Sequence, residues 1–227
     1  MDGFATTPLI VGYTTGTANQ WLLSTSGTDT DNLNSLGASG TVTYGPVTDT
    51  ATTPVTKQAA TFDGTTGTLT SAQSALNTTQ SYTVSAWVDL AHTTSFATAV
   101  SQEDATGTVS SFYLQYSAGD GGWAFVSPST DSPSAASYPR AVDPNPVALN
   151  TWTNLVGVYD ATSHTMSLYV NGTLVGAALN ATPWNATGDL HIASADGNNF
   201  FPGSIADVRT FPTALTSGQI AQLQTTP

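Results

Sequence analysis

Four segments of the sequence combine aromatic rings with carboxylate or amide side chains, which is the chemistry of sugar binding. Aromatic rings stack on the apolar face of a sugar, while carboxylates and amides hydrogen-bond its hydroxyl groups. The segments are the glycine-rich turn before residue 123, the loop 127–148 with its five prolines, and the intervals 181–187 and 194–201. The two tryptophans among them could instead pack in the core. The candidate contact residues are Trp123, Tyr138, Asp143, Trp184, Asp196, Asn198 and Asn199.

The acidic residues do not form the pairs that hydrolytic catalysis would need. Cleavage of a glycosidic bond uses one carboxyl group as acid and a second as nucleophile or base, at a fixed separation. The chain has a single glutamate, Glu103, in an expected loop, and Asp89 stands alone on its expected strand. The histidines His92, His164 and His191 accompany no G-x-S-x-G nucleophile motif. We therefore expect no catalytic residues and no enzymatic activity.

Charge and composition exclude several other classes of protein. Only three basic residues, Lys57, Arg140 and Arg209, stand against 15 acidic ones, for a net charge of −12. No basic cluster exists to neutralise phosphates, so we expect neither nucleic acid nor an anionic membrane as a partner. No apolar run approaches the length of about 18 residues typical of a membrane span. The chain has no cysteine, which excludes disulfides and thiolate metal sites, and its three scattered histidines do not form the cluster that zinc needs.

The strands that must position the candidate residues are visible as alternating patterns. Apolar side chains alternate with others along 82–90, 153–159 and 166–170, which is typical of β-strands. An Asn-Gly pair at 171–172 predicts a hairpin turn, and GDGG predicts another between 112–116 and 123–126. The one helical signal lies near the C-terminus, where Thr216 or Ser217 could cap a short turn. The sequence predicts an all-β, antiparallel sandwich of two sheets, of jelly-roll type.

The first 17 residues are expected to differ from the rest. They carry one short apolar run between Thr and Gly clusters, so we interpret 1–17 as a lead-in strand or linker remnant and 18–227 as a single domain. The start lacks the basic region and apolar core of a signal peptide. The scarcity of lysine and the abundance of Thr and Ser resemble exported bacterial proteins. We expect a secreted or extracellular protein of which this chain is a mature part.

The most telling patterns of the chain are LYVNGTLVG at 168–176 and GSIADVRTFPTALTSGQI at 203–220. Together with QWLLSTSGT at 20–28 and SYTVSAWV at 81–88, in this order, they resemble the laminin-G-like family of concanavalin A-like lectins and glucanases. The resemblance is closest to the form repeated in large secreted actinobacterial proteins. It implies a concanavalin A-like jelly roll that serves as a sugar-binding or adhesion module beside other domains.

The resemblance also implies a structural calcium ion, held between an N-terminal acidic loop and an acidic residue of the closing strand. Calcium prefers oxygen ligands from carboxylates, amides and carbonyls. In this chain the matching positions are Asp31 and Asn32 in the loop and Asp207 in the strand. The alternative is that Asp207 pairs with Arg209 or with solvent and that Asp31 stabilises an Asx turn.

The expected function is a non-catalytic carbohydrate-binding or adhesion module of a secreted multidomain protein. Its expected partners are a glycan or polysaccharide and the other domains of a longer extracellular chain. The alternative is a structural or protein-interaction scaffold domain of an extracellular assembly, which would fit the absence of an obvious catalytic constellation. The fold alone does not decide between them.

Overall fold

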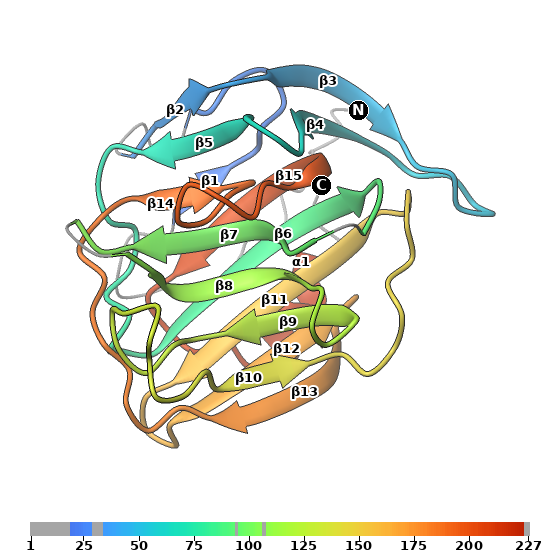
Figure 1. Cartoon of the computed structure of the whole chain (residues 1–227). Coiled ribbons are helices and arrows are strands. Elements are labelled where there is room, and N and C mark those ends of the chain that lie inside the picture. Colours follow the sequence, from blue (N-terminus) through green and yellow to red (C-terminus); the bar gives the residue numbers. More distant parts are fainter. Residues whose placement is uncertain (1–18, 29–33, 94, 106–107, 225–227) are drawn as a thin grey trace, which may run out of the picture.

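The computed structural model describes residues 19–28, 34–93, 95–105 and 108–224. These residues form two antiparallel β-sheets that pack face to face, as Figure 1 shows. One short helix lies near the C-terminus of the described chain. The predicted all-β, two-sheet sandwich is thus confirmed. The expected lead-in at 1–17 lies outside the described residues.

The eight-stranded sheet is built around the segments whose alternation was clearest in the sequence. The predicted meander is confirmed as three consecutive antiparallel strands, and Asn171 and Gly172 turn between two of them with φ values of 48° and 75°. The strand order is β13 (Thr173–Leu179), β12 (Thr165–Val170), β11 (Thr153–Asp160), β6 (Tyr82–Leu90), β15 (Pro202–Phe211), β4 (Thr56–Asp63) and β3 (Val42–Thr48), and β1 (Asn19–Trp21) pairs with β15.

The seven-stranded sheet is the second layer of the sandwich. Strands β7 to β10 pair in chain order, whereas β14 joins β7 to β5 from a distant part of the chain. Glu103 is the last residue of β7, not part of a loop, because its backbone amide donates to the carbonyl of Asp189 at 3.1 Å. The strand order is β10 (Arg140–Val142), β9 (Gly122–Val126), β8 (Ser110–Ser117), β7 (Ala97–Glu103), β14 (Leu190–Ile192), β5 (Thr68–Ser71) and β2 (Leu36–Ser39).

The core lies between the sheets, and an aromatic cluster marks its centre. The ring centroid of Tyr82 is 5.5 Å from that of Phe112, 6.2 Å from that of Phe125 and 5.8 Å from that of Tyr159. These rings come from strands of both sheets, so the cluster joins the two layers. Because side chains alternate along a strand, the residues between these core positions point away from the interior.

The helix α1 (Ser217–Leu223) covers part of the outer face of the eight-stranded sheet. Thr216 caps it, since its hydroxyl accepts from the amide of Gln219 while the Gln219 side chain accepts from the amide of Thr216. Ile220 and Leu223 are buried in a cluster that includes outward-facing residues of β11. In the described part of the chain, no helix has the length and apolar character to cross a membrane.

Candidate functional site

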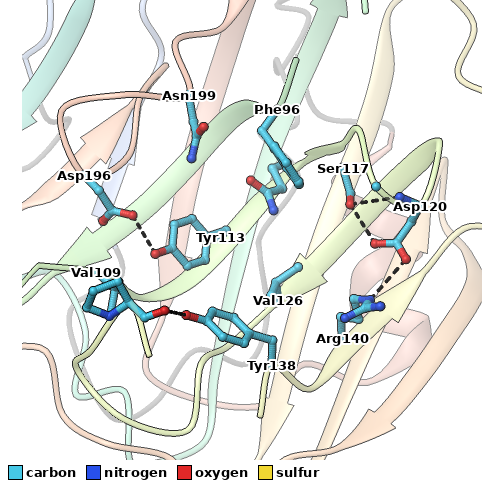
Figure 2. A pocket seen from close by; sticks show the side chains of 13 residues that line it. Phe96, Val109, Tyr113, Ser117, Asp120, Val126, Tyr138, Arg140, Asp196 and Asn199 are labelled. Carbon is cyan, nitrogen blue, oxygen red and sulfur yellow. Dashed lines mark hydrogen bonds and ion pairs between the residues drawn. The ribbon is translucent and has the colours of Figure 1, made fainter. Parts of the chain in front are cut away.

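A pocket of about 480 Å³ lies on the outer face of the seven-stranded sheet. Figure 2 shows that its lining side chains come from β8, β9 and β10 and from the loops beside them. The alternation along β8 builds its floor. Phe112 and Leu114 point into the core, so Tyr113, Gln115 and Ser117 face outward and line the pocket.

A network of hydrogen bonds fixes one side of the pocket. The hydroxyl of Tyr113 donates to Asp196 Oδ2 at 2.6 Å, and the hydroxyl of Ser110 donates to Asp196 Oδ1 at 2.9 Å. The backbone amide of Asp196 donates to Glu103 Oε1 at 2.7 Å. Asp196 has a positive φ of 54° in the turn after β14. These bonds hold both the carboxylate of Asp196 and the ring of Tyr113 in place.

The pKa values of Asp196 and Tyr113 are both raised, mainly by burial. Burial raises the pKa of Asp196, and the neighbouring charge of Glu103 raises it further, against the hydrogen bonds from Tyr113 and Ser110. Burial, followed by the contact with Asp196, also raises the pKa of the Tyr113 phenol. The phenol therefore stays protonated as a donor throughout the ordinary pH range.

The opposite side of the pocket carries an ion pair. Arg140 Nε donates to Asp120 Oδ1 at 3.1 Å, and the hydroxyl of Ser117 donates to Asp120 Oδ2 at 2.6 Å. The other two basic residues of the chain are occupied elsewhere, since Lys57 stacks on a tryptophan ring and Arg209 is buried in an ion pair. Arg140, whose side chain is 50% exposed, is therefore the cation that the pocket presents.

Two further aromatic rings border the pocket. Tyr138 packs beside Tyr113 and Val126, and its hydroxyl donates to the backbone carbonyl of Pro133 at 3.2 Å (Figure 2). Phe96 is an exposed ring on the far side. Both rings thus lie where the flat face of a ligand could reach them.

The pocket unites three of the residues predicted from the sequence and leaves out four. Tyr138, Asp196 and Asn199 all line it. Trp123 does not, and its assignment as a contact residue needs correction. Its side chain is 2% exposed in the core, with its ring centroid 6.5 Å from that of Tyr116. A ring buried between the sheets offers no face to a sugar.

The other three residues do not line the pocket either. Asp143 is buried and accepts from the backbone and side-chain amides of Asn145, so it stabilises a turn. Trp184 is half-buried and donates from Nε1 to the carbonyl of Pro128 at 3.0 Å. Asn198 is exposed in the turn beside the pocket and donates to the carbonyl of Asp196 at 3.2 Å.

The main residues that sequence reasoning missed are Tyr113, Gln115, Arg140 and Phe96. The signal for the first two was present in the alternation of β8, because the polar residues between core positions must face outward. Arg140 stands two residues after Tyr138 and is one of only three basic residues. Phe96, the fourth, precedes β7 and carried no distinguishing pattern.

Asp207, the residue of the closing strand that was expected to bind calcium, already accepts hydrogen bonds from Arg209 and Gln20. Arg209 donates to both oxygens of Asp207, at 2.8 and 2.7 Å, and Gln20 Nε2 donates to Oδ1 at 2.7 Å. A guanidinium at this distance repels a cation, so Asp207 in this arrangement does not fit a calcium ligand. Asp31 and Asn32 lie outside the described residues. Within the ranges that the structure describes, no three His, Cys, Asp or Glu side chains form a metal-binding group.

The comparison with solved structures gives matches of the same fold. Domain 4 of AbnA, an extracellular arabinanase from Geobacillus stearothermophilus solved with arabinotriose, matches with a TM-score of 0.70 and 18% identity, over 91% of this chain and 97% of that one. The botulinum neurotoxin serotype G binding domain matches with a TM-score of 0.63 and 11% identity, over 91% and 50%. Trypanosoma rangeli sialidase matches with a TM-score of 0.61 and 13% identity, over 91% and 32%.

A search of curated proteins gave no match. The comparison with protein families, in contrast, gave a match over most of the chain. Residues 63–221 match the family described as the concanavalin A-like lectin/glucanases superfamily. This match covers most of the chain and includes both the floor of the pocket and the turn that carries Asp196. Together with the two-sheet sandwich, it shows that the chain belongs to the concanavalin A-like lectin/glucanases superfamily.

Proposed function

We propose that this chain is a non-catalytic carbohydrate-binding module and that the pocket over β8 and β9 is its sugar site. The observation that carries the proposal is the convergence of three aromatic rings and fixed polar groups in one pocket. Tyr113, Tyr138 and Phe96 supply ring faces and edges, while the bonded Asp196 and Arg140 orient hydroxyl groups. The pocket volume lies within the range of about 300–1,000 Å³ typical of small-molecule sites.

Binding without catalysis is consistent with the state of the carboxylates. A glycosidase needs one carboxyl group to donate a proton and a second to attack or to activate water. Asp196 and Asp120 are the carboxylates that line the pocket, and each of their oxygens already accepts a hydrogen bond from the protein. These bonds make them fixed supports of the pocket and not free acid–base groups.

A place within a longer extracellular protein is also part of the proposal. The fold match over nearly the full length of domain 4 of an extracellular arabinanase, solved with arabinotriose, supports a sugar-binding domain attached to other domains. The neurotoxin match, which spans half of a binding domain, supports the use of this fold in recognition. The partners proposed for this chain are therefore a glycan or polysaccharide and the neighbouring domains.

The experiment is a pulldown with insoluble polysaccharides followed by calorimetry with soluble oligosaccharides, arabinotriose included. Tyr138→Ala should weaken binding by about two- to tenfold, because a stacking contact contributes about 0.5–1.5 kcal/mol. The control is Leu179→Ala, since Leu179 is 72% exposed on β13 of the other sheet. Equal binding by Tyr138→Ala and the wild type would exclude this pocket as the site.

A structural or protein-interaction module is the second candidate, and one observation favours it. The edge strand β13 exposes two leucines, Leu174 and Leu179, which are 53% and 72% exposed. Exposed apolar side chains on an edge strand are typical of surfaces that pair with another domain. Failure of every polysaccharide and oligosaccharide to bind would favour this candidate over the sugar site.

A further inference from the structure

The hydroxyl groups of Tyr113, Ser117 and Tyr138 in the pocket already donate hydrogen bonds to other atoms of the protein. Tyr113 donates to Asp196 and Ser117 donates to Asp120, both at 2.6 Å. Tyr138 donates to a backbone carbonyl of its own loop at 3.2 Å. The four oxygens of the two carboxylates each accept at least one bond from the protein. Each of these carboxylate oxygens therefore has already used part of its capacity to accept hydrogen bonds.

Gln115 provides donors that have no use inside the protein. Its side chain is only 5% exposed, and Oε1 accepts from the hydroxyl of Thr98 at 3.1 Å, which fixes the orientation of the amide. No described residue accepts from Nε2, although Gln115 lines the pocket. Nε2 is therefore a donor that an acceptor on a bound ligand could use.

Arg140 adds further free donors. Its Nε is used by Asp120, but the two terminal nitrogens have no acceptor among the residues that the structure describes. The guanidinium is planar and presents its N–H groups in a fixed fork. Gln115 Nε2 and the terminal nitrogens of Arg140 are therefore donors that a strong acceptor on a ligand would satisfy.

The charge of the pocket decides which acceptor fits. Asp120 and Asp196 bring two negative charges against the single positive charge of Arg140, and the whole chain carries −12. A carboxylate on the ligand would be repelled, whereas an amide carbonyl is a strong neutral acceptor. The methyl group of an acetamide would also find apolar contacts on Phe96 and Val126.

Building on the sugar site proposed above, we infer that the pocket selects sugars that carry an N-acetyl group, with the acetamido carbonyl accepting from Gln115 Nε2 and Arg140. Plain neutral sugars lack the carbonyl acceptor. Acidic sugars carry a charge that the two aspartates oppose. De-acetylated amino sugars replace the acceptor by an ammonium group that would face the donors of Gln115 and Arg140.

The test compares N,N′-diacetylchitobiose with cellobiose by calorimetry, because these two β-1,4-linked disaccharides differ only in the acetamido groups. N-acetylgalactosamine and N-acetylmannosamine, each beside its parent sugar, cover other configurations, and glucuronic acid covers the acidic class. The N-acetylated member of at least one pair should bind about tenfold more tightly, as expected for one or two additional hydrogen bonds. Equal affinity within every pair, or tighter binding of the acidic sugar, would overturn the inference.

Gln115→Glu tests the donor directly. The substitution keeps the shape and the acceptor for Thr98 but replaces the free amino group by an oxygen, so the preference for the N-acetylated sugar should disappear. Gln58→Glu adds the same charge at an exposed position of β4 and should leave the preference unchanged. Arg140→Lys, on a half-exposed side chain, provides a second variant should Gln115→Glu fail to fold, and it should reduce the same preference.

The outcomes separate this inference from the proposed function. If arabinotriose or cellobiose binds and Tyr138→Ala weakens that binding while no N-acetylated sugar is preferred, the sugar site stands and the acetamido selectivity is wrong. If no sugar of any class binds, the proposed function itself is wrong. A preference that survives Gln115→Glu and Arg140→Lys would show that acetamido recognition arises elsewhere.

Discussion

The hydroxyl of Tyr113 donates to Asp196 at 2.6 Å and at the same time accepts from the backbone amide of Ser110 at 2.9 Å. Tyr113 and Ser110 lie on β8, whereas Asp196 lies 83 residues after Tyr113 in the chain, in the turn that follows β14. One phenol therefore ties a strand of the pocket floor to the loop that forms its wall.

Tyr113→Phe should lower the free energy of unfolding by about 1–3 kcal/mol, because it leaves the Ser110 amide and one Asp196 oxygen without a partner. Chemical denaturation measures this change. The control is Tyr169→Phe on β12, since the Tyr169 hydroxyl has no hydrogen-bond partner among the described residues. Loss of the same size in both variants would show that the hydroxyl of Tyr113 contributes no specific bond.

Gln102 is a second connection between distant segments, and it is fully buried. Its Nε2 donates to the carbonyls of Leu76 and Ala186 at 2.8 and 2.9 Å, while Oε1 accepts from the amides of Ala75 and Leu76. Gln102→Leu removes all four bonds without changing the volume much, so we expect a loss of about 3 kcal/mol or more in unfolding free energy.

The control for Gln102→Leu is Gln58→Leu at an exposed position of β4, which should change stability by no more than about 0.5 kcal/mol. Urea denaturation of both variants measures the difference. A loss below about 1 kcal/mol in Gln102→Leu would mean that the backbone groups of Ala75, Leu76 and Ala186 hydrogen-bond to water as well as they do to Gln102.

How far the sequence predicts the structure depends on whether a signal is local. The Asn171–Gly172 hairpin and the cap by Thr216 were predicted because each depends on neighbouring residues alone. The same kind of reasoning could have placed Trp123 correctly. Trp123 and Phe125 are two apart on one short strand and must share a face, so an apolar Phe125 already indicates the core.

The pocket itself could not be predicted from local patterns. Its two sides meet only because β14 pairs with β7 and the turn after β14 then reaches over β8. Strand order in a jelly roll is decided by packing between sheets, and no short sequence window records it. The sequence could supply candidates such as Asp196 and Tyr138, but not the contact of Asp196 with Tyr113.

Calcium binding by Asp31, Asn32 and Asp207 is untested, and the ion pair between Asp207 and Arg209 argues against Asp207 as a ligand. Because the guanidinium occupies both oxygens of Asp207, we expect that chelator-stripped protein binds no calcium in calorimetry and that its Tm ignores added calcium. Asp207→Asn should instead lower the unfolding free energy by about 3 kcal/mol, because it leaves Arg209 buried without its counter-charge.

The contrary result for calcium would be a rise of Tm with the added ion that Asp207→Asn abolishes. That result would mean that calcium displaces Arg209 from the carboxylate. Asp160→Asn serves as the control for the removal of a negative charge, since Asp160 bonds only within its own turn after β11.

Asp89 makes the stability of the fold dependent on pH in an unusual direction. It is 8% exposed on β6, and no described residue is a partner for its buried Oδ1. Burial raises its pKa, and the nearby charge of Asp49 raises it further. Between the ordinary pKa of about 3.9 and the raised value, the folded state holds more protons than the unfolded state. The contribution of Asp89 to stability therefore falls as the pH rises through this window.

Asp89→Asn should remove that dependence, because an amide cannot ionise. We expect the free energy of unfolding to rise by about 1 kcal/mol near pH 7 and to match the wild type near pH 3, where the carboxyl is protonated. Denaturation curves across this range measure the difference. Asp160→Asn is a control of opposite sign, since the amide of Thr162 and the hydroxyl of Ser163 lower the pKa of Asp160. A stability gain in Asp89→Asn that does not change with pH would show that packing, and not the charge of Asp89, is responsible.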